Sequence, residues 1–132
     1  MMDRLLLIAA GGALGAVARY GVGVWALRLF PAAQWPWGTL AVNVVGGLLM
    51  GLLAGWLAFR GGLHGESIRL FAAVGLLGGF TTFSAFSLEA ALMIERRQFA
   101  MAGGYAAVSV ILSIAALFVG LMVARRAFGA AL

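Results

Sequence analysis

Four long apolar stretches constrain the fold of this chain more than any other feature of its sequence. Each is long enough for a transmembrane helix, which needs about 20 residues. In hydrocarbon, only helices and closed barrels satisfy their own backbone polar groups. We therefore predict one all-α integral membrane domain that occupies residues 1–132. Its four spans are expected at about residues 5–29, 38–59, 68–94 and 99–124.

Charge and composition indicate that the surroundings are a lipid bilayer. Hydrophobic residues make up 64% of the chain and charged residues 10%, whereas soluble domains carry about 25% charged residues. The net charge of +5 rests on arginines that, with one exception, lie near the ends of the spans. That placement is typical of headgroup contacts, so we expect no nucleic acid as a partner. The chain has no cysteine, which excludes disulfides and thiolate chemistry.

The arginines are distributed almost evenly between the two ends of the predicted bundle. Four spans place both termini and the second loop on one side, and the other two loops on the opposite side. The first side holds Arg4, Arg60, Arg69, Arg125 and Arg126, and the second holds Arg28, Arg96 and Arg97. Because orientation follows the arginine and lysine bias, a bias this weak predicts a chain that can insert in both orientations.

The third span contains a stretch that is unsuited to a continuous helix. Residues 75–89 read GLLGGFTTFSAFSLE, with three glycines followed by four hydroxyl side chains. Glycine weakens a helix by roughly 1 kcal/mol relative to alanine, and hydroxyls offer the backbone alternative partners. We expect the third helix to break near its middle, at Gly78–Thr81, and to resume at Phe83. Within a bilayer such a break is tolerated only inside protein or beside a wet cavity.

Two buried polar residues add to this picture. Arg19 shares one face of the first span with Gly11, Gly15 and Gly23 and lies about 15 Å along the helix from Leu29. A mid-membrane arginine either bonds carbonyls at a helix break or attracts an anion, and both readings stay open. Asn43 is the strongly polar side chain of the second span. It is either an interhelical hydrogen-bonding residue or a pore-lining donor.

Aromatic and hydroxyl side chains recur at helical spacing in the last two spans. Phe83 and Phe86 share a face and are either core residues or rings whose positive edges meet an anion. Tyr105, Ser109 and Ser113 form an i, i+4, i+8 stripe that either bonds another helix or lines a polar track. Glu89 is the one acid within a span, and no histidine or cysteine cluster accompanies it. The sequence therefore argues against an enzyme and favours conduction of a small anion.

These motifs resemble the Fluc (CrcB) family of fluoride channels. The matching runs are GGALGAVARY at 11–20, WGTLAVNVVGGLLMG at 37–51 and GLLGGFTTFSAFS at 75–87. The resemblance implies an antiparallel, dual-topology homodimer with two fluoride pathways, each built from both subunits. It also implies a structural sodium ion at the dimer centre, held by the backbone carbonyls of Gly78 and Thr81.

The resemblance also assigns roles to single residues. Those matching the family's fluoride pathway are Asn43, Phe83, Phe86, Tyr105, Ser109, Ser113, Arg19 and Glu89. One departure is Ala85, where the family usually has a threonine.

We therefore predict a passive, fluoride-selective export channel in a prokaryotic inner membrane, with no protein partner beyond its second copy. Two other functions remain open at this point. A small dual-topology exporter of cationic compounds would need a carboxylate deep in the first helix, where this chain has Arg19. A non-transporting structural subunit of a membrane complex would explain the glycine stripes but leaves the polar track without a role.

Overall fold

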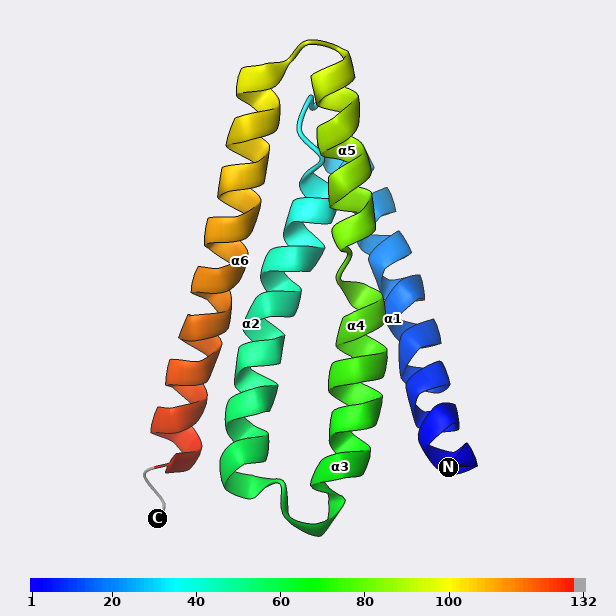
Figure 1. Ribbon diagram of the computed structural model, residues 1–132, viewed down its shortest axis with the longest axis vertical. Coiled ribbons are helices and arrows are strands. Elements are labelled where there is room, and N and C mark those ends of the chain that lie inside the picture. The colour runs from blue at the N-terminus through cyan, green and yellow to red at the C-terminus, as the bar shows by residue number, and fades with distance from the viewer. Residues whose placement is uncertain (130–132) are drawn as a thin grey trace.

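The protein is a bundle of helices, shown in Figure 1 as a computed structural model that describes residues 1–129. Helix α1 (Met2–Leu29) and helix α2 (Trp37–Arg60) come first. The third rod is built from η1 (Gly62–His64), α3 (Gly65–Ile68), η2 (Arg69–Leu77), α4 (Gly78–Phe80) and α5 (Phe83–Glu95). Helix α6 (Phe99–Phe128) completes the bundle. Four of these segments are long and apolar enough to cross a membrane, which confirms the predicted all-α architecture.

The four rods converge at one end of the molecule and spread apart at the other (Figure 1). The narrow end carries the connectors from α1 to α2 and from α5 to α6. The wide end carries the N-terminus, the turn after α2 and the end of α6. Helices α1 and α6 form the outer rods, with α2 and the third rod between them. This arrangement places the two sets of arginines at opposite ends, since each set belongs to residues at or beyond the helix termini.

Helices α2 and α6 run parallel and approach closely along the glycine stripe of α2. A Cβ atom added at Gly47 would lie 2.7 Å from the Ser113 carbonyl oxygen. One at Gly51 would collide with the Leu117 carbonyl oxygen, and one at Gly55 with Ala124 Cβ. Small residues at this spacing let the two helix backbones meet without side chains between them.

The glycine face of α1 makes the same kind of contact with the third rod. A Cβ atom at Gly11 would collide with the Phe71 carbonyl oxygen, and one at Gly15 with the Leu76 carbonyl oxygen. On the other side of the contact, a Cβ atom at Gly79 would lie 2.6 Å from the Gly12 carbonyl oxygen. Helix α1 is thus held against η2 and α4 by backbone contact.

The third rod is broken, but its break lies later than the predicted Gly78–Thr81. Gly78–Phe80 remain helical as α4, whereas Thr81 and Thr82 are extended, with ψ of 158° and 119°. Hydroxyl chemistry explains the position. Thr81 Oγ1 donates to the Leu77 carbonyl, and Thr82 Oγ1 accepts from the Ala85 N–H as the N-cap of α5. The prediction was wrong for Gly78 and Gly79, which stay helical, and the packing of Gly79 against Gly12 and Ala16 of α1 accounts for this.

The turns before the break are wider than those of an α-helix. Segment η2 has the i→i+5 hydrogen-bond pattern of a π-helix over nine residues. Such turns are rare in proteins and occur often beside functional sites. The sequence contains no signal that predicts them.

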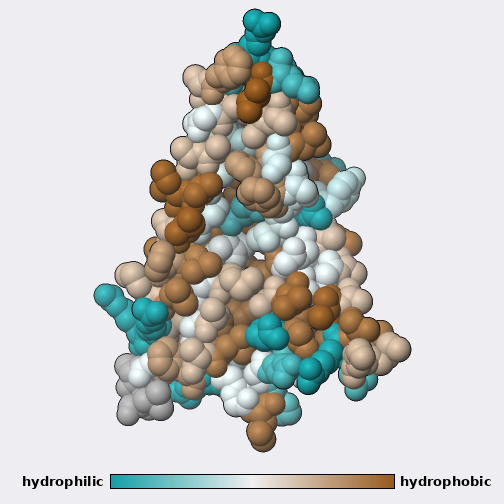
Figure 2. Space-filling model, viewed as in Figure 1, coloured by the Kyte–Doolittle hydropathy of each residue, from teal (hydrophilic) through white to brown (hydrophobic). Residues whose placement is uncertain are grey.

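Apolar side chains cover most of the face seen in Figure 2, and hydrophilic atoms gather at its two ends. A smaller group of hydrophilic atoms lies near mid-height, at the level of the break. This pattern is the one expected for a bundle whose sides meet lipid or a second copy and whose ends meet headgroups.

Candidate functional site

Two clefts lie beside the break and share Thr82 as a lining residue. The first, here called the α6 groove, has a volume of about 450 Å³ and lies between α2, α5 and α6. The second, here called the α1 cleft, has a volume of about 390 Å³ and is lined by α1, α2 and α5. The break therefore borders two open spaces that are each large enough to admit ions and water.

Asn43 on α2 holds the extended backbone of Thr82. Its Oδ1 accepts from the Thr82 N–H at 2.8 Å, and its Nδ2 donates to the Thr82 carbonyl at 3.0 Å. One amide thus satisfies both backbone groups of a buried residue that has left the helix. An asparagine amide has two N–H donors, so the second remains available to the α6 groove, which Asn43 also lines.

The carbonyls of Gly78 and Thr81 are among those that lose their helical partners at the break. In a continuous helix the Gly78 carbonyl would accept from the Thr82 N–H, and the Thr81 carbonyl from the Ala85 N–H. Here the Thr82 N–H donates to Asn43, and the Ala85 N–H donates to Thr82 Oγ1. The side chains of Asn43 and Thr82 therefore release the two carbonyl oxygens that the family resemblance assigns to a cation.

Arg19 serves a third carbonyl of the same segment. Its Nε donates to the Gly79 carbonyl at 3.1 Å, and the half-buried side chain lines the α1 cleft. In a continuous helix this carbonyl would accept from the Phe83 N–H, so Arg19 replaces the donor that is lost at the break. This contact matches the structural interpretation of Arg19, while its place in the cleft keeps its charge near an open space.

Glu89 is held by two hydroxyls at the point where the helices meet. Its Oε1 accepts from Thr39 Oγ1 at 2.6 Å, and its Oε2 accepts from the Tyr105 hydroxyl at 2.7 Å. The carboxylate lines the α1 cleft, and Tyr105 is fully buried. A carboxylate with both oxygens bonded is more stable inside a membrane protein than an isolated one.

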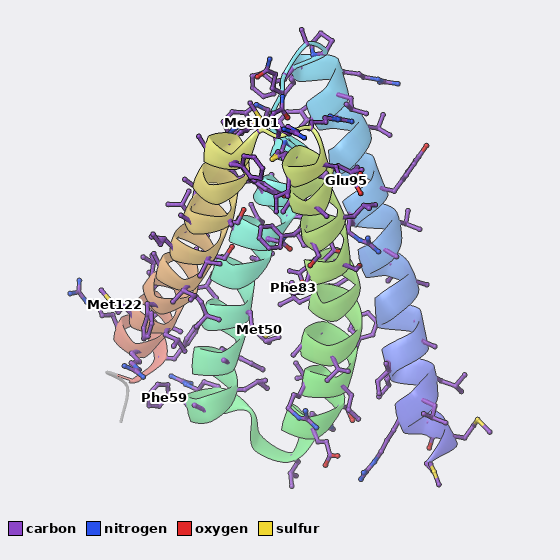
Figure 3. All side chains as sticks on the ribbon, turned by 45° about the horizontal axis from the view of Figure 1, so that its top comes forward. Met50, Phe59, Phe83, Glu95, Met101 and Met122 are labelled. Atoms are coloured by element: carbon purple, nitrogen blue, oxygen red, sulfur yellow. The ribbon has the colours of Figure 1, made fainter. Side chains whose placement is uncertain are left out.

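The aromatic rings of α5 and α6 form a continuous row beside the α6 groove. The ring centroids of Phe83 and Phe86 lie 5.5 Å apart, and those of Phe86 and Tyr105 lie 5.2 Å apart. Phe86 is half-buried, whereas 78% of the Phe83 surface is exposed. In Figure 3 Phe83 projects from α5 beside the gap that separates α5 from α2.

The hydroxyl stripe of α6 runs along the same groove. Ser109 and Ser113 both line it, one helical turn apart. Ser109 Oγ is buried and has no hydrogen-bond partner among the residues that the structure describes. An unpaired buried hydroxyl costs free energy, so this atom is suited to a ligand or water within the groove.

The structure therefore divides the predicted site residues into two groups. Asn43, Phe83, Phe86, Ser109 and Ser113 line the α6 groove, together with Thr81. Arg19 and Glu89 line the α1 cleft, together with Ala85. Tyr105 connects the groups, because its ring packs on Phe86 and its hydroxyl bonds Glu89.

Sequence reasoning missed two residues of this site. Thr39 binds Glu89, and Thr82 caps α5 and receives Asn43. A signal for Thr39 was present, since it lies four residues before Asn43 and so shares its helix face. The signal for Thr82 was the N-cap preference of threonine.

Comparison of the sequence with known proteins identifies a family to which the chain belongs. The family model described as "CrcB-like protein, Camphor Resistance (CrcB)" matches residues 6–121. A protein of Caulobacter sp. (strain K31) named "Fluoride-specific ion channel FluC" is 65% identical over 96% of this chain and 98% of its own length. Proteins of the same name are 61% identical in Caulobacter vibrioides (strain NA1000 / CB15N) and 49% identical in Agrobacterium fabrum. These two matches cover 96% of this chain and 99% and 100% of their own lengths.

Proposed function

The chain belongs to the CrcB-like family, and from this premise we propose that it is a passive, fluoride-selective ion channel. One observation carries the proposal from the structure. The donors and ring edges suited to a small anion gather in the α6 groove, directly beside the break, and not at scattered positions in the bundle. Among the described residues that line that groove there is no carboxylate, which favours an anion over a cation there.

Fluoride is small and strongly hydrated, so the groove must replace lost water with donors. The free N–H of Asn43 and the hydroxyls of Ser109 and Ser113 supply donors at successive levels. Phe83 and Phe86 add the positive edges of their rings, which attract an anion weakly and let it leave. A route narrow enough for these contacts favours fluoride over larger halides.

The α1 cleft is proposed as the approach to this groove from the narrow end. It reaches from the aromatic connector at Trp35 and Trp37 down to Thr82, where the groove begins. Arg19 supplies a cation within it, and Glu89 is occupied by its two hydroxyl partners. The cleft thus draws anions towards the break while its one carboxylate is bonded.

We propose that the working unit is an antiparallel homodimer in which each pathway uses both copies. The α6 groove is open along its side, and Phe83 presents most of its ring there. Gly78, beside the break, is exposed as well. A second copy on this face would cover the ring and enclose the groove. The weak difference of five arginines against three between the two ends supports insertion in opposite orientations.

A structural sodium ion between the two copies fits the chemistry of the break. The Gly78 and Thr81 carbonyls would hold it, because both have lost their helical donors and hard cations take oxygen ligands. When bound, such an ion would compensate the partial negative charges of the carbonyl oxygens that have lost their N–H donors. A heavier monovalent cation soaked into crystals should give an anomalous peak beside these carbonyls. The peak should persist in Thr81→Ala, which keeps the backbone, and its absence from wild type would contradict the assignment.

The direction of transport follows from the membrane potential. A potential that is negative inside the cell drives an anion outward with about 2.3 kcal/mol per charge for each 100 mV. A channel open to fluoride therefore empties the cytoplasm of that ion without a coupled reaction.

Fluoride efflux from liposomes tests the proposed function. Purified protein is reconstituted into liposomes loaded with fluoride or with chloride, and ion release is followed with ion-selective electrodes after addition of a potassium ionophore. Rapid fluoride release and little chloride release are expected. No release from correctly folded protein would contradict the channel, and equal release of both ions would contradict the selectivity.

A further inference from the structure

The lining of the α6 groove changes from polar to apolar towards the wide end of the bundle. On α2 the groove is lined by Asn43, then Gly46 and Gly47, then Met50. On α6 it is lined by Ser109, then Ser113, then Leu117. Val110 and Ile114 lie beside the two serines. The side-chain donors of these two helices therefore end with Asn43 on α2 and with Ser113 on α6, and the level of Met50 and Leu117 carries none.

The two apolar side chains lie at the same level. Helices α2 and α6 run parallel, and Gly47 meets the Ser113 carbonyl oxygen. One turn later Gly51 meets the Leu117 carbonyl oxygen. Met50 directly precedes Gly51, so it lies at about the level of Leu117, and both side chains line the groove roughly one turn, about 5.4 Å, beyond the last hydroxyl of the stripe.

Met50 faces the open part of the groove. Figure 3 shows Met50 on α2 and Phe83 on α5 at the gap between these helices, and both residues line the groove. The Met50 side chain is half-buried. Methionine is unbranched and has three rotatable side-chain bonds. Its thioether end can therefore move into and out of the groove, which a stiffer, branched side chain does less readily.

We propose that Met50, with Leu117 and Ile114, forms a hydrophobic gate at the wide end of the hydroxyl stripe and limits the rate of conduction. The inference rests on the proposed function as a fluoride channel. An anion that leaves Ser113 meets a level without donors, and an apolar constriction of this kind opposes ions when it is empty of water. Movement of the Met50 thioether admits water and lets the anion pass.

Two substitutions with opposite expected effects test the gate. Met50→Ser shortens the side chain and adds a donor, so fluoride efflux from liposomes should rise severalfold, by roughly threefold or more. Met50→Phe fills the same space with a rigid apolar ring, so efflux should fall about tenfold or more. Opposite signs at one position distinguish a gate from a packing residue, because loss of folding lowers efflux in both variants.

Met122 offers a matched control. It lies on α6, does not line the groove and has 51% of its surface exposed. Met122→Ser and Met122→Phe should therefore leave efflux at the wild-type rate. If both Met50 variants conduct at the wild-type rate while wild type conducts fluoride, the gate is wrong and the channel stands. If wild type conducts no fluoride, the channel and the gate both fall.

Discussion

The double hydrogen bond between Asn43 and Thr82 provides a sharp test of how the break and the ion pathway are connected. Asn43→Asp changes one atom's identity and leaves the size of the side chain the same. The remaining carboxylate oxygen at Oδ1 still accepts from the Thr82 N–H at the present 2.8 Å. The second oxygen, however, replaces the donor that now lies 3.0 Å from the Thr82 carbonyl.

Two costs follow, and they differ in size. Removing the donor to a buried carbonyl costs about 1–3 kcal/mol of stability. A carboxylate in the groove also repels an anion: two unit charges about 4 Å apart interact by about 4 kcal/mol at an effective dielectric constant near 20. That repulsion alone corresponds to a decrease in flux of roughly 1000-fold. The effect on conduction should therefore far exceed the effect on folding.

The pH dependence of the variant separates these causes. A protonated aspartic acid has one donor and one acceptor, so it restores both bonds to Thr82 and removes the charge. Fluoride efflux of Asn43→Asp should be lowest at neutral pH and should recover in part as the pH falls, because the protonated acid has no second donor for the groove. Wild-type efflux over the same pH range corrects for the conversion of free fluoride to HF. Wild-type efflux from the variant at neutral pH would refute the reasoning, because it would mean that no anion passes Asn43.

Three further perturbations concern the rings, the helix contact and a loop. Phe83→Ile and Phe86→Ile should each reduce fluoride efflux while the protein keeps its oligomeric state in size-exclusion chromatography; unchanged efflux in both would show that the rings only pack. Gly51→Leu should destabilise the bundle by about 1–3 kcal/mol, the usual cost of overpacking, because its Cβ collides with the Leu117 carbonyl oxygen. An unchanged thermal midpoint would contradict that contact. Arg97 has a φ of 60°, a left-handed conformation that costs a non-glycine residue about 1 kcal/mol, so Arg97→Gly should raise the midpoint, and a lower one would contradict the strain.

The sequence was sufficient to predict the elements that depend on local patterns. Membrane-length apolar stretches and glycine stripes follow from spacing, but the sequence did not indicate that Gly47, Gly51 and Gly55 of α2 meet α6. The break was predicted in the right span because glycine and hydroxyl residues gather there. Its position was misjudged by a few residues, since the packing of Gly79 against α1 is a tertiary effect that overrides helix propensity.

The sequence singled out residues that line the two clefts, but it could not predict how they are arranged. Nothing in the sequence indicates that Thr39 and Tyr105 share the two oxygens of Glu89, because the three residues come from different helices. The same holds for the division between the α6 groove and the α1 cleft, which depends on how α1 leans against the third rod. The wide turns of η2 have no sequence signature that would have revealed them.

The two readings of Asn43 that the sequence left open are compatible, and the geometry explains why. A primary amide has one acceptor oxygen and two N–H donors. The oxygen and one donor are used to hold Thr82 in an extended conformation, which leaves the second donor for the groove. Holding Thr82 also takes its N–H away from Gly78, so a single side chain lines the proposed anion route and releases the carbonyl that we propose holds a cation. Residues 43 and 82 are therefore expected to tolerate substitution poorly for two reasons at once: a change that leaves the groove intact still alters the carbonyls of the break.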